Sequence, residues 1–169
     1  MAIRLSERAV DNVVTLLQTN LATELTAIDT ERGDGIVTPA PASAQYYKRP
    51  KDEIAGATCH VEVFEGSYEF LNAYSDQDAQ RAASIYPLTV RVTCFRRSGE
   101  SADTMTLIRR RLAVGVVNTL LTNTTYTDAE IQRVLVTRVE HDDDYAEDGT
   151  LAKVQTTLAL VVHMEESYT

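Results

Sequence analysis

The alternation of apolar and polar residues predicts a long helix near the middle of the chain, over residues 101–123. Its first apolar stripe recurs at spacings of three and four and is formed by Met105, Ile108, Leu112, Val116 and Leu120. A second stripe lies on the neighbouring face and is formed by Leu107, Val114, Val117 and Leu121. Ser101 or Asp103 can cap the helix, because a short side-chain oxygen accepts hydrogen bonds from N–H groups of the first turn. A helix with so much apolar surface must be covered on two sides. We expect a sheet on one side, and either the first helix or another copy of the protein on the other.

A second amphipathic helix is predicted near the N-terminus, over residues 6–28. Its apolar stripe consists of Val10, Val13, Val14, Leu17, Leu21, Leu25 and Ile28. The opposite face carries Asp11 and a series of threonines. Because this stripe is narrower than the apolar surface of the central helix, we expect this helix to lie on the outside of the fold.

Residues 30–54 interrupt both periodicities and predict a long extended arm. The glycines and prolines of the arm are Gly33, Gly35, Pro39, Pro41 and Pro50. A stretch of roughly 25 irregular residues is longer than a compact domain normally contains. We therefore expect the arm to be mobile in the free subunit, or to be held by something outside its own domain. Tyr46 and Tyr47, beside Lys48 and Arg49, are the residues best suited to anchor it on a partner.

Four segments alternate with the period of two that is typical of half-buried strands: 57–65, 88–96, 131–140 and 151–164. Between the first two, residues 66–86 form an insertion, for which we expect a short extra hairpin or a turn of helix. The last two are joined by HDDDYAEDG, which we interpret as a hairpin tip with Gly149 available for a positive φ. The predicted order is α-β-β-α-β-β. The fold class is therefore α+β, a four-stranded, mainly antiparallel sheet with two helices packed on one face.

Composition narrows the class of protein further. A chain of 169 residues fits a single domain, 1–169, with a substantial hydrophobic core. No run approaches the roughly 18 apolar residues of a membrane span, and the N-terminus lacks the apolar segment of a signal peptide. We expect synthesis in the cytoplasm and no membrane partner. The net charge of −9 argues against binding nucleic acid through its phosphates, but suits a surface past which DNA slides.

The residues that could carry chemistry do not form a recognisable catalytic or metal site. His60, His141 and His163 are not at ligand spacing, and the adjacent Cys59 and His60 point to opposite faces of a strand. The sequence has neither a Gly-x-Ser-x-Gly turn nor a phosphate-binding glycine loop. We therefore expect no enzyme, no cofactor and no metal. Cys59 and Cys94 lie inside apolar strands, where we expect small, reduced core residues.

An acidic cluster occupies the predicted hairpin tip. It includes Asp142, Asp143, Asp144 and Asp148. An EF-hand loop needs glycine at its sixth position and glutamate at its twelfth, and counting from Asp144 places Gln155 at the twelfth. We interpret the cluster as a solvated acidic loop, with a weak divalent-ion site as the alternative.

Three successive arginines, Arg109, Arg110 and Arg111, stand in the central helix. Successive helical residues are about 100° apart, so the three guanidinium groups fan around the helix and do not form one basic face. Two interpretations stay open. The arginines form ion pairs with acids of the same chain, or they bridge to acidic groups on a neighbouring subunit, since arginine offers planar bidentate contacts.

In element order and pattern, the chain resembles the lambda-type tail terminator proteins of long-tailed bacteriophages. The resemblance spans nearly the whole chain. It is carried by the N-terminal helix VDNVVTLLQTNLATEL, the proline-containing arm, the strands HVEVFE and LTVRVTCF, the helix LIRRRLAVGVVNTLL and the closing hairpin that begins RVLVTRVEHDDD. It implies a virion protein that forms a ring, usually of six copies, on the head-proximal end of the tail tube. Such a ring stops tube growth and presents a surface to the head or neck.

The resemblance also implies partners: other copies of the chain, the tail tube protein, and head–tail connector or neck proteins. DNA would pass through the ring without specific binding. The candidate subunit or partner contacts are Tyr46, Tyr47, Arg49, Arg109, Arg110 and Arg111. Two other functions stay open, another neck ring protein (a head–tail adaptor or head-completion protein) and a small oligomeric ligand-binding or enzymatic α+β domain.

Overall fold

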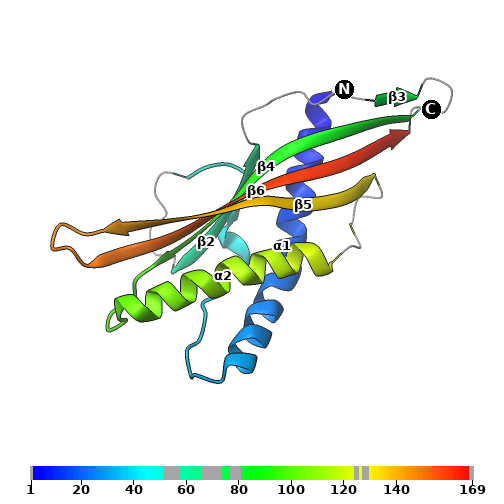
Figure 1. Cartoon of the computed structure of the whole chain (residues 1–169). Helices are drawn as coiled ribbons and strands as arrows, with labels where there is room; N and C mark the ends of the chain where they lie inside the picture. Colours follow the sequence, from blue (N-terminus) through cyan, green and yellow to red (C-terminus); the bar gives the residue numbers. More distant parts are fainter. Residues whose placement is uncertain are drawn as a thin grey trace.

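The computed structural model describes residues 2–51, 58–65, 74–76, 81–123, 126 and 130–167. They form an α+β fold of two helices and one mixed sheet (Figure 1). The elements in chain order are α1 (Ala2–Arg32), the 3-10 turn η1 (Ser43–Gln45), β1 (Tyr46–Tyr47), β2 (Cys59–Glu65), β3 (Tyr74–Asp76), β4 (Arg81–Phe95), α2 (Ala102–Thr122), β5 (Ile131–Tyr145) and β6 (Leu151–Ser167). None of the helices in these residues is long and apolar enough to cross a membrane.

The sheet has the strand order β1-β2-β4-β6-β5, with β3 paired to β4. The four long strands are antiparallel to one another, as predicted. The prediction of only four strands was wrong, because β1 adds a parallel pair beside β2 and β3 adds a short antiparallel one. Strands of two and three residues are too short to show an alternating pattern. The rest of the expected insertion, residues 66–73 and 77–80, lies outside the described residues.

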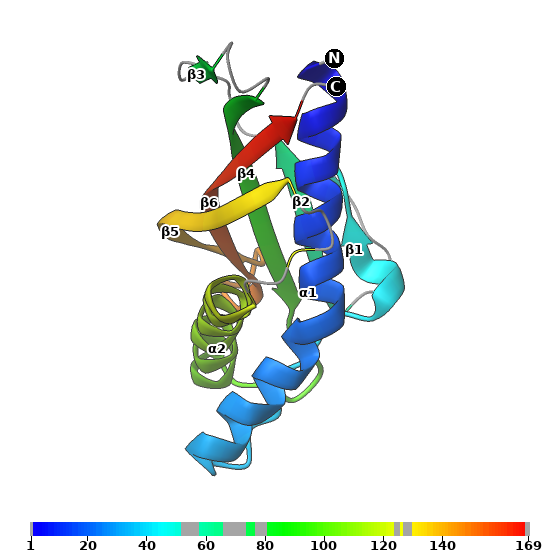
Figure 2. The ribbon, with the colours of Figure 1, turned by 90° about the vertical axis from the view of Figure 1, so that its right-hand side faces the viewer.

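The core lies between the sheet and the two helices. Both helices pack on the same face, α1 against β1, β2 and β4, and α2 against β4, β5 and β6 (Figure 2). Cys59 and Cys94 are paired across β2 and β4, and both are buried and free, as predicted. Burial raises the pKa of the Cys94 thiol well above its ordinary value.

Helix α2 has almost the bounds that the pattern predicts. Ser101 caps it, because its Oγ accepts a hydrogen bond from the N–H of Thr104 at 3.1 Å. The first apolar stripe of α2 is buried throughout, and α1 crosses α2 at Gly115. A Cβ atom at Gly115 would lie 2.6 Å from Cδ2 of Leu25 and 3.4 Å from Cδ1 of Leu21. The glycine therefore permits the close approach of the two helices.

The stretch that follows α1 is not a free arm. Helix α1 continues through Arg32, and residues 33–51 pack against their own chain. The backbone N–H and the hydroxyl of Thr38 both donate to the carboxylate of Asp29, each at 2.7 Å. Gln18 of α1 donates to the carbonyl of Ser43 at 3.0 Å. We expected an arm that is mobile or held only by an outside partner. For these residues that expectation was wrong, because hydrogen bonds within the chain hold a segment that has few apolar side chains. Residues 52–54 lie outside the described part of the chain.

The acidic segment is also placed differently from the prediction. Strand β5 continues through Tyr145, so Asp142, Asp143 and Asp144 lie in a strand and not in a loop. Aspartate is depleted in β-strands, but these three aspartates continue the pairing of β5 with β6. The turn is confined to residues 146–150, where Gly149 has a φ of 77° and Asp148 accepts hydrogen bonds from both the N–H and the hydroxyl of Thr150.

Candidate interaction surfaces

Part of the second apolar stripe of α2 faces solvent, while Val117 packs against the core. Val114 is 48% exposed and Leu121 is 52% exposed, while Leu107 is half-buried. The exposed Arg110 lies on the same side of the helix, three residues after Leu107 and four before Val114. Of the two covers that the sequence left possible, the first helix packs on α2 on the Gly115 side, and it leaves Val114 and Leu121 exposed.

Exposed apolar side chains gather on α2 and on β5. Within the described residues, the large hydrophobic side chains classed as exposed are Val37, Val114, Leu121, Val139 and Tyr145. Two of these belong to α2 and two to β5. Strand β5 is the last strand of the sheet, and α2 packs against it. Helix α2 and the edge strand β5 lie side by side at one side of the molecule (Figure 2).

Two of the three arginines form ion pairs within their own chain. One guanidinium nitrogen of Arg109 contacts both carboxylate oxygens of Asp143 at 2.5 Å. Arg111, whose side chain is 6% exposed, donates to Asp29 at 2.8 Å, to the carbonyl of Ile36 at 3.0 Å and to Asp34.

The same contacts explain why the pKa of the Asp34 carboxyl is shifted. The N–H of Ile36 and the Arg111 guanidinium hold the pKa of Asp34 below its ordinary value. Pairing within the chain is therefore the correct interpretation for Arg109 and Arg111. Arg110 is exposed and forms no ion pair within the described residues, so it stays a candidate for contact with a neighbour.

A row of carboxylates follows the free edge of the sheet. Glu140, Asp142 and Asp144 alternate along β5 and stand opposite Thr157, Gln155 and Lys153 of β6, on the face that the helices do not cover. Asp143 points to the other face, toward α2. Glu140 pairs with Arg138, and Asp144 lies 3.2 Å from Lys153. Asp142 is exposed and has no ion pair in the described part of the chain. We call Glu140, Asp142 and Asp144 the acidic row.

The opposite edge of the sheet is basic. Directly after β1 come Lys48, Arg49 and Lys51, which we call the basic segment. Lys48 lies 2.7 Å from Asp11 of α1, and Lys51 stacks over the ring of Tyr47 with its nitrogen 5.1 Å from the ring centroid. Arg49 is exposed and forms no ion pair with any described residue.

The two tyrosines of this edge are used within the chain. The hydroxyl of Tyr46 donates a long hydrogen bond, 3.5 Å, to the carbonyl of Leu17, and burial raises its pKa to about 12. Tyr47 packs edge-on against His60, with ring centroids 6.2 Å apart. Both rings therefore attach β1 to its own domain, and Arg49 is the predicted contact residue that stays open to a partner.

A buried charged cluster on the uncovered face of β2 was missed from the sequence. Glu62 is only 1% exposed. One of its oxygens accepts from the N–H of Lys51 at 2.5 Å, and the other lies 3.7 Å from both His60 and Arg91. Burial alone would raise the pKa of Glu62, but the contact with His60, the Lys51 N–H and the charge of Arg91 outweigh it and lower the pKa. The alternating pattern assigned this face to solvent, yet Glu62 and Arg91 are paired in register.

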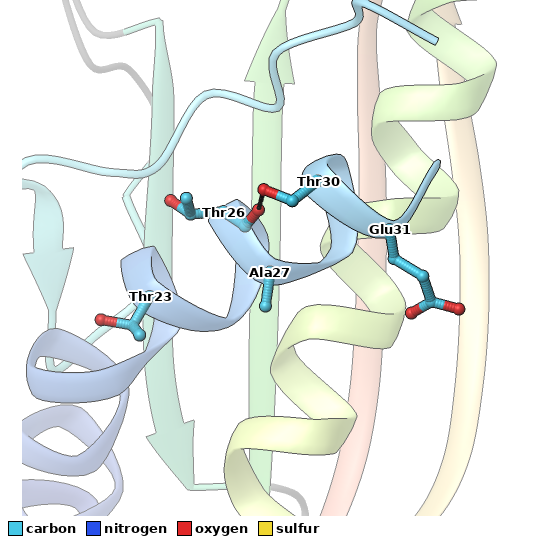
Figure 3. Close-up of a pocket in the computed structure, with 5 residues that line it drawn as sticks. All are labelled: Thr23, Thr26, Ala27, Thr30 and Glu31. Atoms are coloured by element: carbon cyan, nitrogen blue, oxygen red, sulfur yellow. Dashed lines mark hydrogen bonds between the residues drawn. The ribbon is translucent and has the colours of Figure 1, made fainter. Parts of the chain in front are cut away.

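The described residues contain no group of three or more His, Cys, Asp or Glu side chains that could hold a metal ion. An open depression of about 620 Å³ lies along the outer side of α1 (Figure 3). Its lining residues are Thr23, Thr26, Ala27, Thr30 and Glu31. The hydroxyls of Thr26 and Thr30 each donate to the carbonyl four residues earlier, so they are already satisfied within the helix. This depression brings together no pair of groups suited to acid–base or nucleophilic chemistry.

Comparisons with known proteins give no family. No family model matches the chain, and none of the curated proteins matches it either. A solved chain from the virion of a native gene transfer agent particle is 12% identical, with a TM-score of 0.47 over 89% of this chain and 95% of that one. Another solved structure is 11% identical, with a TM-score of 0.36 over 92% of this chain and 96% of that one. Likeness at this level carries no argument about function.

Proposed function

We propose that this chain is a structural virion protein, a tail terminator that forms a ring at the head-proximal end of a phage tail tube. The observation that carries the proposal is that the two edges of the sheet present unlike surfaces. The β5 edge carries the acidic row, and the β1 edge carries the basic segment. Subunits of a closed ring bind head to tail through two different patches. The order of helices and strands resembles that of lambda-type tail terminators, and this resemblance supports a terminator ring in particular.

A terminator must also bind different partners above and below the ring. One face contacts the last ring of tail tube protein, and the other contacts the neck or head–tail connector. The β5–β6 hairpin projects to one side of the fold and ends in a turn with Glu147 and Asp148 (Figure 1). This hairpin supplies an element that is distinct from the rest of the surface and is suited to one of these contacts.

The charge of the chain suits the passage of DNA. Each subunit carries a net charge of −9, so a ring of several copies repels phosphates unless cations screen it. DNA therefore passes through without specific binding. The proposed role is structural, with no catalytic step and no cofactor.

A phage that lacks this chain is expected to make tails of uncontrolled length that fail to join heads, because nothing stops tube polymerisation. The measurement is the distribution of tail lengths in electron micrographs of lysates, with the wild-type gene supplied from a plasmid as the control. Tails of normal length that stay unattached would place the protein in the neck instead. Normal, attached tails would contradict both roles.

A further inference from the structure

We propose that copies of this chain bind head to tail, with the acidic row of one copy against the basic segment of the next. This inference rests on the proposed function, because it names the contact that closes the ring. One half consists of Glu140, Asp142 and Asp144. The other half consists of Lys48, Arg49 and Lys51.

The topology of the sheet supplies the geometry that such a contact needs. Strands β1 and β5 are the two ends of the strand order and lie on opposite sides of the molecule (Figure 2). A contact between two different patches on opposite sides repeats from copy to copy, and it closes into a ring when the rotation per copy allows. Patches on the same side could not repeat in this way.

The charges select this pairing over the alternatives. Contact between two β5 edges would bring two acidic rows together, and contact between two β1 edges would bring two basic segments together. Like charges placed opposite each other cost free energy and suppress the wrong complex. Only the combination of one edge with the other brings Asp142 near Arg49, and both are exposed without an ion pair within the described residues. An arginine–carboxylate pair is among the stronger and more directional polar contacts.

The contact is expected to use side chains more than strand pairing. The pairing of β5 with β6 shifts register at three places, near Arg133, Arg138 and Tyr145, so the edge strand is irregular. Such bulges and charged side chains disfavour the addition of another strand at a sheet edge.

A disulfide-trapping experiment tests the contact directly. The double variant R49C/D142C, treated with the mild thiol oxidant diamide, is expected to give a ladder of covalent oligomers that stops at one closed ring. Mixing the single variants R49C and D142C in equal amounts is expected to give covalent dimers and nothing larger. The natural Cys59 and Cys94 are each 1% exposed, so they do not take part.

The variant V37C/D142C is the matched control, because Val37 is 70% exposed and belongs to neither half of the contact. It is expected to give no ladder. An equal ladder from this control, or rapid cross-linking of D142C with itself, would overturn the proposed contact.

Charge reversal provides an independent readout of the same contact. D142R alone and R49E alone are each expected to weaken self-association at least tenfold in sedimentation experiments. An equal mixture of the two is expected to recover, because alternating copies bring opposite charges together at every contact. The double variant D142R/R49E, in which both charges are exchanged, is expected to recover. Wild-type oligomers that neither reversal affects would overturn the contact and leave the proposed function standing. A wild-type chain that self-associates neither in solution nor on tail tubes would overturn both.

Discussion

Replacing Arg111 with methionine is expected to lower the free energy of unfolding by about 1.5–3 kcal/mol, because it removes a buried guanidinium and its charge-assisted hydrogen bonds to Asp29 and Asp34. The Arg111 side chain is 6% exposed and contacts Asp29, Asp34 and the carbonyl of Ile36. Methionine keeps much of the length of the side chain, so the loss reports on the charge and its hydrogen bonds more than on packing. Urea denaturation measures the effect.

Arg110 provides the matched control for this variant. It is the neighbouring residue of the same helix, and it is exposed. Substitution of Arg110 with methionine is expected to change the free energy of unfolding by no more than about 0.5 kcal/mol. Amide hydrogen exchange should also increase around residues 34–38 in the Arg111 variant alone, since these residues lose their contact with α2. Equal unfolding energies for the two variants would contradict the role given to Arg111.

Replacing Glu62 with glutamine is expected to lower the free energy of unfolding by about 3 kcal/mol near neutral pH, since it removes one partner of a buried charged cluster. It should also change how stability depends on pH. The folded-state pKa of Glu62 lies below its ordinary value of 4.5, so the unfolded state binds the proton more readily. The stability that the carboxylate contributes is therefore fully present above pH 4.5, and it is lost as the pH falls through the lowered folded-state pKa.

The glutamine variant cannot lose this contribution, so its stability should fall less steeply with acid than that of the wild type. The measurement is a series of urea denaturation curves between pH 3 and pH 7, which bracket the ordinary carboxyl range. Glu140 is exposed on β5, and its change to glutamine serves as the control. An unchanged acid dependence in the Glu62 variant would show that its pKa is not lowered in the folded state.

The local sequence pattern predicts the helices and strands of this fold that pack through continuous apolar surfaces. The stripe from Met105 to Leu120 was assigned correctly, as was the Ser101 cap, because a helix of this kind is defined by spacing and by its first turn. The four long strands followed from alternation for the same reason. Strand β5 ran five residues past its predicted end, because pairing with β6 overrides the weak strand preference of aspartate.

Contacts between residues distant in sequence could not be predicted in the same way. Thr38 is held by Asp29, and Asp34 is held by Arg111, 77 positions later in the chain. The hydrophobic pattern of a sequence does not indicate such hydrogen bonds, so the sequence predicted a free arm at residues 33–51. Glu62 was missed because the alternation of β2 assigned it to solvent, although the chain at Lys51 covers it. The set of candidate contact residues is therefore smaller. Arg49 and Arg110 remain candidates, whereas Arg109 and Arg111 form ion pairs within their own chain.

The central claim is that this chain caps tail tubes, and incubation of gold-labelled protein with purified tubes tests it most directly. Electron microscopy is expected to show label at one end of each tube, with none along its length, and capped ends that no longer grow when tube protein is added. The R49E variant is expected to label fewer ends, because ring closure is weakened. Label along the tubes, or labelled ends that go on growing as untreated ends do, would contradict the claim.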